Sequence, residues 1–532
     1  MRPWTKAPKF VQCLSKQIVD RGPHWHPADV LDRETTPNKD LRYSEFVYFH
    51  PFVQRVLYPC AAEPNPALAI LGRNDITGVE VTLGGKQQPL TMDVKRVHLY
   101  LFRSETALLV TEVASRGPLP LPTVLEFADQ FRRAYSPYHS DGSGGHCPER
   151  VKWISTDSSL TLNESNYLPE HMHRTAFDPA KRRTPIAAHW LSLLTPLKPV
   201  WEAGPADIAM EQLEDDRIPT MLYAGIADPF SLGRGDFMRI CFCDGEWAPN
   251  DLPYAQAFLK DFEKKYCYDR FWNPPDPNGP GSEFYRRQLE RRFSRYLCNG
   301  NNFAVVTKPD GYGDIILKHF RHHYFQIGLL AHFHRASLLK YSRRLTDEVP
   351  SAVVSGDGHW DALIQVRRQF ADFLNEYWFR EISNQDQAKE LFQWWSERLG
   401  NKELLDQLSA EAMAVDRILN QERDRKQEAF QIKQQQEVKE LQASTDRLTK
   451  AIFWLAGLTV IVAFLDTEMM RDFARHGASW FLLFLDPRWC ETFQLWWPLG
   501  WNIVWAALGI LILWFAWKKM FKDRDKRHVH KD

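Results

Sequence analysis

Residues 441–465 read LQASTDRLTKAIFWLAGLTVIVAFL, and this stretch decides the fold that the sequence predicts. It starts as the end of a polar helix, and its last part, 451–465, contains no charged residue. A helix needs about 20 mainly apolar residues to cross roughly 30 Å of hydrocarbon. With Leu448 and Thr449 added, the apolar run approaches that length. We therefore predict a first transmembrane helix over 451–466, with a buried core helix as the alternative.

A second run without charge, LWWPLGWNIVWAALGILILWFAW, starts at Leu495 and predicts another transmembrane helix over 495–518. Basic residues crowd the tail 519–532, whereas the connector 467–494 holds few. Because basic residues flank the cytoplasmic ends of membrane helices, both termini should be cytoplasmic and the connector periplasmic. The predicted location is the bacterial inner membrane, with membrane lipids as partners.

The stretch 401–450 contains no proline or glycine and is rich in residues that favour helix, so we predict a long helical stalk. Leu441, Leu448 and Leu455 lie seven residues apart, and this apolar stripe continues into the predicted span. Farther upstream the stripe becomes polar, at Asn420, Gln427 and Gln434. Two interpretations stay open: a dimeric coiled coil, or a stalk around an axis that enters the membrane as the inner ring of a pore.

Small and polar residues share one face of the first predicted span. Ala456, Thr459, Ala463 and Asp466 are spaced three, four and three residues apart, as on one helical stripe, and would line a pore. Asp466 and Glu468 would form an acidic ring at its outer mouth, which attracts cations. The alternative for Asp466 is a solvated residue that ends the helix.

The region 1–270 has the pattern of a cytoplasmic α/β domain that could sense a ligand. The β-rich runs VHLYLF and ALLVTEV predict a hairpin within 94–113, and 221–225 and 237–242 are predicted as further strands. Residues 271–400 are predicted to be a mainly helical cytoplasmic region that leads into the stalk.

Charge and motif content narrow the function. The 67 Lys and Arg residues balance 67 Asp and Glu residues, whereas nucleic-acid-binding proteins carry an excess of basic residues. The eight cysteines include no Cys-x-x-Cys pair, which argues against a zinc ribbon or a thioredoxin motif. The sequence contains no nucleophile-elbow, Walker A or Rossmann glycine motif. We expect no direct nucleic-acid partner and no enzymatic activity.

Arginine pairs are the candidate ligand-binding residues. Guanidinium groups bind phosphates and carboxylates through paired hydrogen bonds, so Arg132, Arg133, Arg286 and Arg287 could hold an anionic ligand. The alternative is that these pairs lie on solvated helix faces.

Histidines crowd one predicted helical region. His319 and His323 are four residues apart, a spacing that can place two imidazoles on one metal ion. No cysteine or carboxylate lies at ligand spacing, so surface or hydrogen-bonded histidines are the favoured interpretation.

The predicted order of a cytoplasmic α/β domain, a long helix, two spans and a basic tail resembles the CorA superfamily of cation transport proteins. The strings YFQIGLL (324–330) and RASLLK (335–340) are also similar to a CorA-like branch. The resemblance implies a homopentameric funnel and Mg²⁺ as a permeant ion. The Gly-Met-Asn signature of the family is missing, and DTEMM (466–470) stands in its place, so no family site residue is transferred.

Three functions follow from these expectations. The first is a CorA-like oligomeric inner-membrane cation channel gated by its cytoplasmic domain. The second, implied by resemblance to CorA-like membrane effectors of type III CRISPR defence, is an antiphage effector activated by a nucleotide second messenger. The third is a membrane scaffold that conducts no ions.

Overall fold

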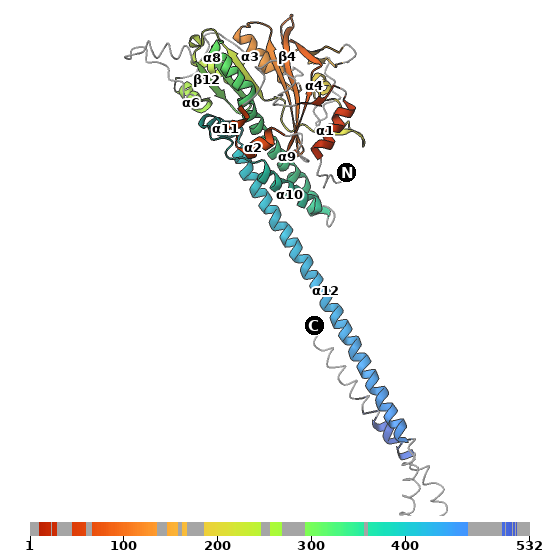
Figure 1. Ribbon diagram of the computed structural model, residues 1–532. Helices are drawn as coiled ribbons and strands as arrows, with labels where there is room; N and C mark the ends of the chain where they lie inside the picture. The colour runs from red at the N-terminus through yellow and green to blue at the C-terminus, as the bar shows by residue number, and fades with distance from the viewer. Residues whose placement is uncertain are drawn as a thin grey trace, which may run out of the picture. The chain divides into compact units, whose positions relative to one another are not determined.

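The computed structural model divides the chain into two compact units, residues 1–417 and residues 418–532 (Figure 1). The structure describes residues 10–22, 24–28, 45–59, 66–135, 146–157, 162–167, 186–245, 256–268, 293–355, 360–465, 503–505, 507–512, 514–515 and 518.

An antiparallel sheet of seven strands is built from the N-terminal part of unit 1. Its strand order is β1-β2-β4-β3-β6-β7, and β5 pairs with β4. The strands are β1 (His26–Pro27), β2 (Leu68–Arg73), β3 (Ile76–Thr82), β4 (Leu90–Phe102), β5 (Thr106–Ser115), β6 (Arg150–Ser155) and β7 (Ser165–Asn166). The predicted hairpin is confirmed, because β4 and β5 pair from Met92 opposite Ser115 to Phe102 opposite Thr106.

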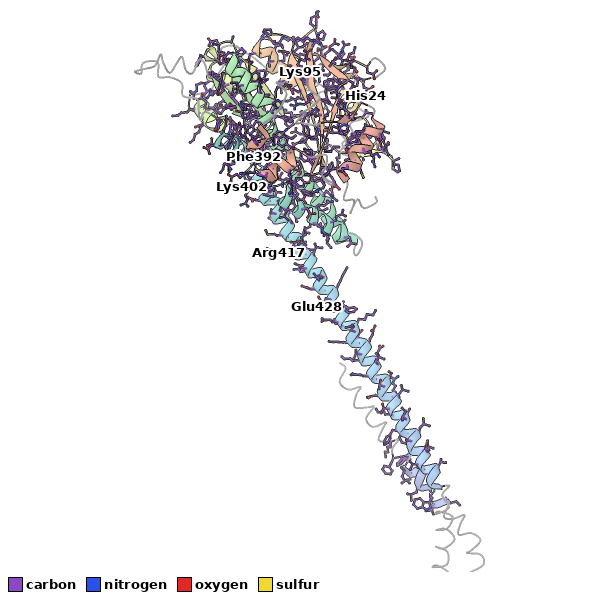
Figure 2. The ribbon with its side chains drawn as sticks, viewed as in Figure 1. His24, Lys95, Phe392, Lys402, Arg417 and Glu428 are labelled. Carbon is purple, nitrogen blue, oxygen red and sulfur yellow. The ribbon has the colours of Figure 1, made fainter. Side chains whose placement is uncertain are left out.

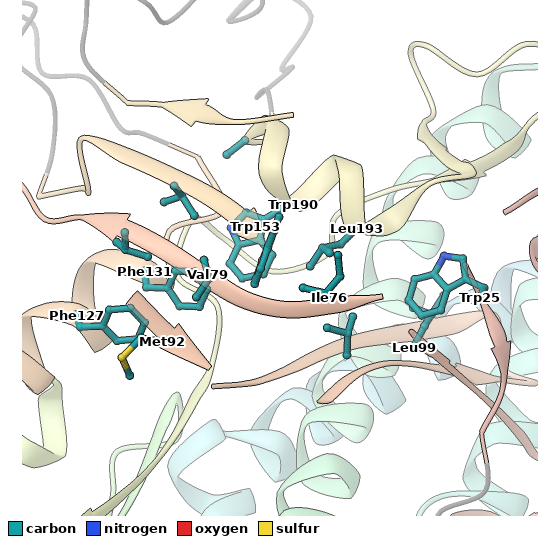
Figure 3. Close-up of a cluster of buried hydrophobic side chains, with 14 of the residues drawn as sticks. Trp25, Ile76, Val79, Met92, Leu99, Phe127, Phe131, Trp153, Trp190 and Leu193 are labelled. Atoms are coloured by element: carbon teal, nitrogen blue, oxygen red, sulfur yellow. The ribbon is translucent and has the colours of Figure 1, made fainter. Parts of the chain in front are cut away.

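One face of this sheet packs on a large apolar core. Side chains alternate between the two faces of a strand, so Val97, Leu99 and Leu101 of β4 point into the core together. Three helices cover this face: α1 (Phe10–Arg21), α3 (Leu121–Phe131) and α4 (Ala188–Leu194). Figure 3 shows Trp153 of β6 beside Trp190 of α4 in this core. Each large apolar side chain that is fully buried stabilises the fold by about 1.5–3 kcal/mol.

The opposite face of β4 packs on the long helix α9 (Phe325–Ser355). The rings of Phe102 and Phe333 stack with their centroids 3.7 Å apart. Next to them, the hydroxyl oxygens of Thr106 and Ser337 lie 3.3 Å apart in the buried interface. The sheet is therefore covered on both faces.

A second sheet has the strand order β10-β13-β12-β11. Strands β10 and β13 are parallel, and the other neighbours are antiparallel. Its strands are β10 (Thr220–Gly225), β11 (Cys267–Tyr268), β12 (Ser294–Cys298) and β13 (Asn302–Thr307). The predicted strand at 221–225 is thereby confirmed. Shorter elements are η2 (Glu45–Tyr48), α2 (Pro51–Leu57), the parallel pair β8 (Leu197–Pro199) and β9 (Ile208–Met210), and η5 (Pro229–Ser231).

The helices α5 (Arg234–Phe242) and α6 (Gln256–Tyr266) pack on this second sheet. The prediction of a strand at 237–242 is wrong, because these residues belong to α5. Phe237, Ile240 and Cys241 are buried, and their spacing of three and one residues places them on one helix face. The apolar residues of this stretch therefore follow the helical period rather than the period of a strand.

Helices follow β13 to the end of unit 1. They are α8 (Gly311–His319), the π-helical turn η6 (Phe320–Tyr324), α9, α10 (Trp360–Glu376) and α11 (Asp386–Leu399). Gly400 ends α11 at φ +67, a left-handed conformation that glycine adopts without steric cost.

The last long helix, α12 (Asn401–Leu465), starts directly after Gly400. In unit 1 the side-chain amide of Asn401 donates to the carbonyl of Ala331 at 2.9 Å. Leu408 and Val415 are buried, and Asp416 pairs with Arg367 of α10 at 2.5 Å. The start of α12 is therefore fixed to the helices of unit 1.

Among the residues that the structure describes, no helix is both long and apolar enough to cross a membrane. The prediction of two C-terminal transmembrane helices is therefore wrong. The inner-membrane location and the ion channel were inferred from those spans, so these predictions are also contradicted.

Helix length gives the physical reason. The uncharged end of α12, 451–465, would extend over about 22 Å at roughly 1.5 Å per residue, whereas the hydrocarbon core is about 30 Å thick. Arg447 and Lys450 lie directly before it. Of the second predicted span, the structure describes 503–505, 507–512, 514–515 and 518. The connector 467–494 and the tail 519–532 lie outside the described residues.

Candidate functional site: the exposed seam of helix α12

The part of α12 in unit 2 carries a regular row of apolar and threonine side chains, which we call the seam. Its members alternate strictly at three- and four-residue spacing: Val438, Leu441, Thr445, Leu448, Ile452, Leu455, Thr459 and Val462. This is the repeat of helices that pack side by side in a coiled coil. The predicted leucine stripe is one half of the seam, and the other half repeats at the same seven-residue spacing.

The apolar members of the seam are exposed. The six valine, leucine and isoleucine side chains have between 52% and 66% of their surface exposed. Monomeric proteins rarely expose a contiguous apolar surface of this length, and such a surface indicates an interaction site. The seam is therefore a candidate interaction site.

The two threonines of the seam are compatible with burial. The Thr445 hydroxyl donates to the carbonyl of Leu441 at 2.9 Å, and the Thr459 hydroxyl donates to the carbonyl of Leu455 at 2.7 Å. Each hydroxyl is therefore satisfied within its own helix and can be covered without losing a hydrogen bond. The γ-methyl groups are then available for packing, so the seam is apolar over its full length.

Charged side chains avoid the seam. Within 438–462 the five charged residues are Lys439, Glu440, Asp446, Arg447 and Lys450. With about 3.6 residues per turn, all five lie on the opposite side of the helix. Figure 2 shows the side chains along α12, where Arg417 and Glu428 are labelled. A partner helix at the seam would bury none of these five charges.

Toward the start of unit 2, the same repeat passes through glutamines. Gln427, Gln431 and Gln434 occupy the positions that precede Val438 at three- and four-residue spacing. Polar residues at such positions lower stability but fix the register between helices. The seven-residue repeat of α12 therefore has a polar end, formed by these glutamines, and an apolar end, which is the seam.

The predicted pore-lining residues lie partly on this surface. Thr459 belongs to the seam, and Ala456 is exposed beside it. The backbone of Ala463 lies in the last turn of α12, but its side chain is outside the described part of the chain. Asp466 and Glu468, the predicted acidic ring, also lie outside the described residues.

The predicted ligand-binding arginines that directly follow α3, Arg132 and Arg133, are placed in a buried junction. Arg132 donates to Asp129 at 2.7 Å, and Arg133 donates to Asp216. Both side chains are about nine-tenths buried or more. A ligand anion would compete with these two carboxylates, and the binding role of Arg132 and Arg133 stays a prediction. Arg286 and Arg287 lie outside the described residues.

The backbone at Arg132 and Arg133 adds further hydrogen bonds to this junction. The carbonyl of Arg133 accepts hydrogen bonds from the Tyr167 hydroxyl at 2.9 Å and from the Trp190 ring nitrogen at 3.0 Å. The carbonyl of Arg132 accepts from the Ile218 amide at 2.9 Å. This segment joins the first sheet to the chain that leads into β10.

The histidines of the predicted helical region make separate contacts with different aromatic side chains. Within the described ranges, no group of three or more His, Cys, Asp or Glu side chains could hold a metal ion. His323 packs against the ring of Phe49 with centroids 5.0 Å apart, and His334 stacks on Trp378 at 4.7 Å. Burial lowers the pKa of His334 to about 4, so its ring is neutral at pH 7.

No family model, curated protein or solved structure matches this chain.

Proposed function

We propose that the chain is a homo-oligomeric scaffold, in which the seams of several α12 helices pack parallel and in register and so hold several copies of unit 1 in one assembly. One observation carries this proposal: an exposed repeat of eight residues, uninterrupted by charge, runs along α12 from Val438 to Val462. Burial of each leucine or isoleucine of the seam would contribute about 1.5–3 kcal/mol per copy.

A second copy of the chain is the partner that fits this surface. Coiled-coil packing requires a partner with the same seven-residue repeat, and an identical helix has it by construction. A parallel pair in register would place leucine beside leucine and Gln434 beside Gln434. An antiparallel pair centred on Leu448 would place Gln434 near Val462, so a polar layer would meet an apolar one. The polar end therefore favours the parallel arrangement.

The residues beside the seam favour more than two helices. These flanking residues carry no charge and include Gln442, Ser444, Thr449, Ala451 and Ala456. In a larger bundle each helix contacts two neighbours, so residues on both sides of the seam are covered. A dimer would leave these flanks exposed, where charged residues are the usual choice. The number of subunits, for which the predicted value is five, stays a prediction.

Sedimentation equilibrium of the full chain tests the assembly. The chain has a mass of 62.2 kDa, and we expect a mass that is a multiple of this value at micromolar concentration. A monomeric mass over the whole concentration range would contradict the scaffold.

Cysteine cross-linking tests the orientation. Leu441→Cys and Leu455→Cys, introduced separately, should each form disulfide-linked dimers on mild oxidation, because parallel helices in register bring each position beside itself. An antiparallel pair centred on Leu448 would cross-link only a mixture of the two variants. Lys450→Cys, on the charged side of the same helix, is the matched control and should cross-link no more than the parent chain.

A further inference from the structure

A second candidate site lies in unit 1, on the face of β4 that α9 and η6 cover. Arg96, His98 and Tyr100 alternate along β4, so their side chains lie on the same face of the sheet. Arg96 and Tyr100 contact Phe325, the first residue of α9, and His98 lies beside Tyr100. The Arg96 guanidinium carbon lies 4.6 Å from the centroid of the Phe325 ring, and the Tyr100 ring lies 5.9 Å from it. The rings of His98 and Tyr100 are 6.0 Å apart.

Positive charge exceeds negative charge in this cluster. Glu112, which lies opposite Arg96 in the sheet, faces two guanidinium groups: Arg96 at 3.1 Å and Arg321 of η6 at 2.6 Å. Both arginines are charged at all ordinary pH values. Asp93, the acidic residue nearest along β4, already pairs with Lys95 and Arg116. One carboxylate therefore balances two cations, which leaves one positive charge for a ligand.

The π-helical turn explains how Arg321 reaches the sheet. A π-helical turn interrupts the regular hydrogen-bond ladder of the helices on either side, and such turns are frequent at functional sites. Here the Arg96 guanidinium donates to the backbone carbonyl of Arg321 at 3.5 Å. The same turn thus supplies both a side-chain cation and a backbone contact to β4.

Polar atoms of the cluster lack a hydrogen-bond partner among the described residues. On β4 they are the Tyr100 hydroxyl, Nδ1 of His98 and Nε of Arg96; beside them, Nε of Arg321 and Oε2 of Glu112 form ion pairs but no hydrogen bond. The Tyr100 side chain is fully buried, and the charges of Arg96 and Glu112 both act on its hydroxyl. Native proteins leave few buried polar groups unpaired, because such a group loses its hydrogen bonds to water without replacement. The unpaired Tyr100 hydroxyl and Arg96 Nε belong to the two side chains that contact Phe325, and together they indicate a missing partner.

The protonation states of Tyr100 and His98 are compatible with a bound anion. Burial raises the pKa of Tyr100, so the hydroxyl keeps its proton and can donate it to a ligand oxygen. Burial lowers the pKa of His98 to about 3, so its ring is neutral at pH 7. The positive charge of the site therefore comes from the two arginines.

We propose that Arg96, Tyr100 and Arg321 bind a small oxyanion, the carboxylate or phosphate group of a metabolite, at the contact between β4 and η6. The two guanidinium groups supply the charge, and the Tyr100 hydroxyl donates one hydrogen bond. Arg96 can turn its unpaired Nε toward the ligand while its Nη2 stays on Glu112. The site links β4 and β5 of the first sheet to the helices that follow the second sheet, so a ligand would stabilise the packing of one on the other.

Isothermal titration calorimetry of the full chain tests the proposal, with sodium phosphate in one arm and sodium acetate in the other at constant ionic strength. We expect saturable binding of one anion per chain, and the arm that binds more tightly identifies the group. Tyr100→Phe should weaken that binding by roughly tenfold, and Arg321→Gln should abolish it. Arg116→Gln, on the same sheet but outside the cluster, should leave the affinity unchanged.

Thermal unfolding separates binding from misfolding. Tyr100→Phe removes a hydroxyl that has no hydrogen-bond partner in the described part of the chain, so the variant should unfold at the same or a higher temperature than the parent chain without anion. The parent chain should be stabilised by the anion, and Tyr100→Phe should be stabilised less. Absence of saturable heat in both arms would overturn the proposal. Binding that neither Tyr100→Phe nor Arg321→Gln weakens would also overturn it. In either case a buried water would be the partner of the Tyr100 hydroxyl. These results are independent of the mass of the assembly.

Discussion

The ammonium group of Lys340 donates a hydrogen bond of 3.0 Å to the carboxylate of Glu105, and this ion pair joins the β4–β5 turn to the middle of α9. Lys340 also donates to the carbonyl of Ser104. Arg344, one turn farther along α9, lies 3.7 Å from the same carboxylate. Glu105 has φ +62, a left-handed conformation that is normally occupied by glycine or asparagine. The two ion pairs explain why a glutamate occupies this position.

Two substitutions of Glu105 should distinguish the contribution of the ion pairs to stability from the cost of the backbone strain. Glu105→Ala keeps the left-handed conformation and leaves Lys340, whose side chain is only 11% exposed, without its carboxylate. We expect a loss of about 1–3 kcal/mol in the free energy of unfolding. Glu105→Gly also loses the pairs but relieves about 1–2 kcal/mol of strain, so it should lose less. Urea unfolding measures both values, and equal losses would contradict the assignment of strain to this turn.

A buried histidine should make the stability depend on pH. His334 is 1% exposed, and one ring nitrogen lies 2.6 Å from the Tyr377 carbonyl, to which it donates. Burial lowers its pKa to about 4, so between pH 4 and 6.5 the unfolded chain binds more protons than the folded chain. The contribution of His334 is therefore complete above pH 6.5 and is lost as the pH falls toward 4, by about 3 kcal/mol.

The pH dependence can be assigned to this residue by substitution. In His334→Gln, thermal unfolding temperatures at pH 7 and pH 5 should differ less than in the parent chain, although the variant is less stable at both. His319→Gln, which changes a half-buried histidine of α8, is the control. An unchanged difference between the two pH values in His334→Gln would assign the effect to other groups.

Local patterns of the sequence predicted the parts of the fold that depend on near neighbours. The β4–β5 hairpin could be predicted because its two runs have strand composition and its turn has only three residues. The stretch at 237–242 was assigned to the wrong element because it is short and rich in β-forming residues. Its helical state depends on burial of Phe237 and Ile240 against the second sheet. That contact is made with residues far along the chain.

The two candidate sites also differ in how much of each could be predicted from the sequence. Half of the α12 seam could be read from the leucine spacing, since one helix contains the whole repeat. The cluster around Phe325 could not be predicted, because Arg96 and Arg321 are 225 residues apart in sequence and meet only through the packing of β4 on η6. The predicted membrane spans rested on composition, and composition does not fix the length of an apolar helix.

Two helical glycines should respond in opposite directions to the same change. A Cβ atom at Gly328 of α9 would lie 2.4 Å from the Trp395 ring, which is buried and donates to the carbonyl of Gly300 at 2.9 Å. Gly328→Ala should therefore destabilise unit 1 by about 1–3 kcal/mol through overpacking. A Cβ atom at Gly457 of α12 would meet nothing within 4 Å. Gly457→Ala should stabilise α12 by up to about 1 kcal/mol.

Circular dichroism during thermal unfolding distinguishes these outcomes. Gly328→Ala should lower the unfolding temperature, and Gly457→Ala should leave it unchanged or raise it. An unchanged unfolding temperature in Gly328→Ala would contradict the close packing of α9 on α11 at Trp395.

The seam makes the sharpest prediction for the assembly. Leu448→Glu places a charge at the centre of the seam, where a parallel bundle would bring identical glutamates together in an apolar layer. Burial of an unpaired charge costs several kcal/mol, so the assembly should dissociate at concentrations where the parent chain is associated. Lys450→Glu introduces the same side chain two residues away, on the charged side of the helix, and should leave the mass unchanged. Sedimentation equilibrium measures the mass of the assembly in both variants. If both variants or neither variant dissociated, the contact between subunits would lie elsewhere than at the seam.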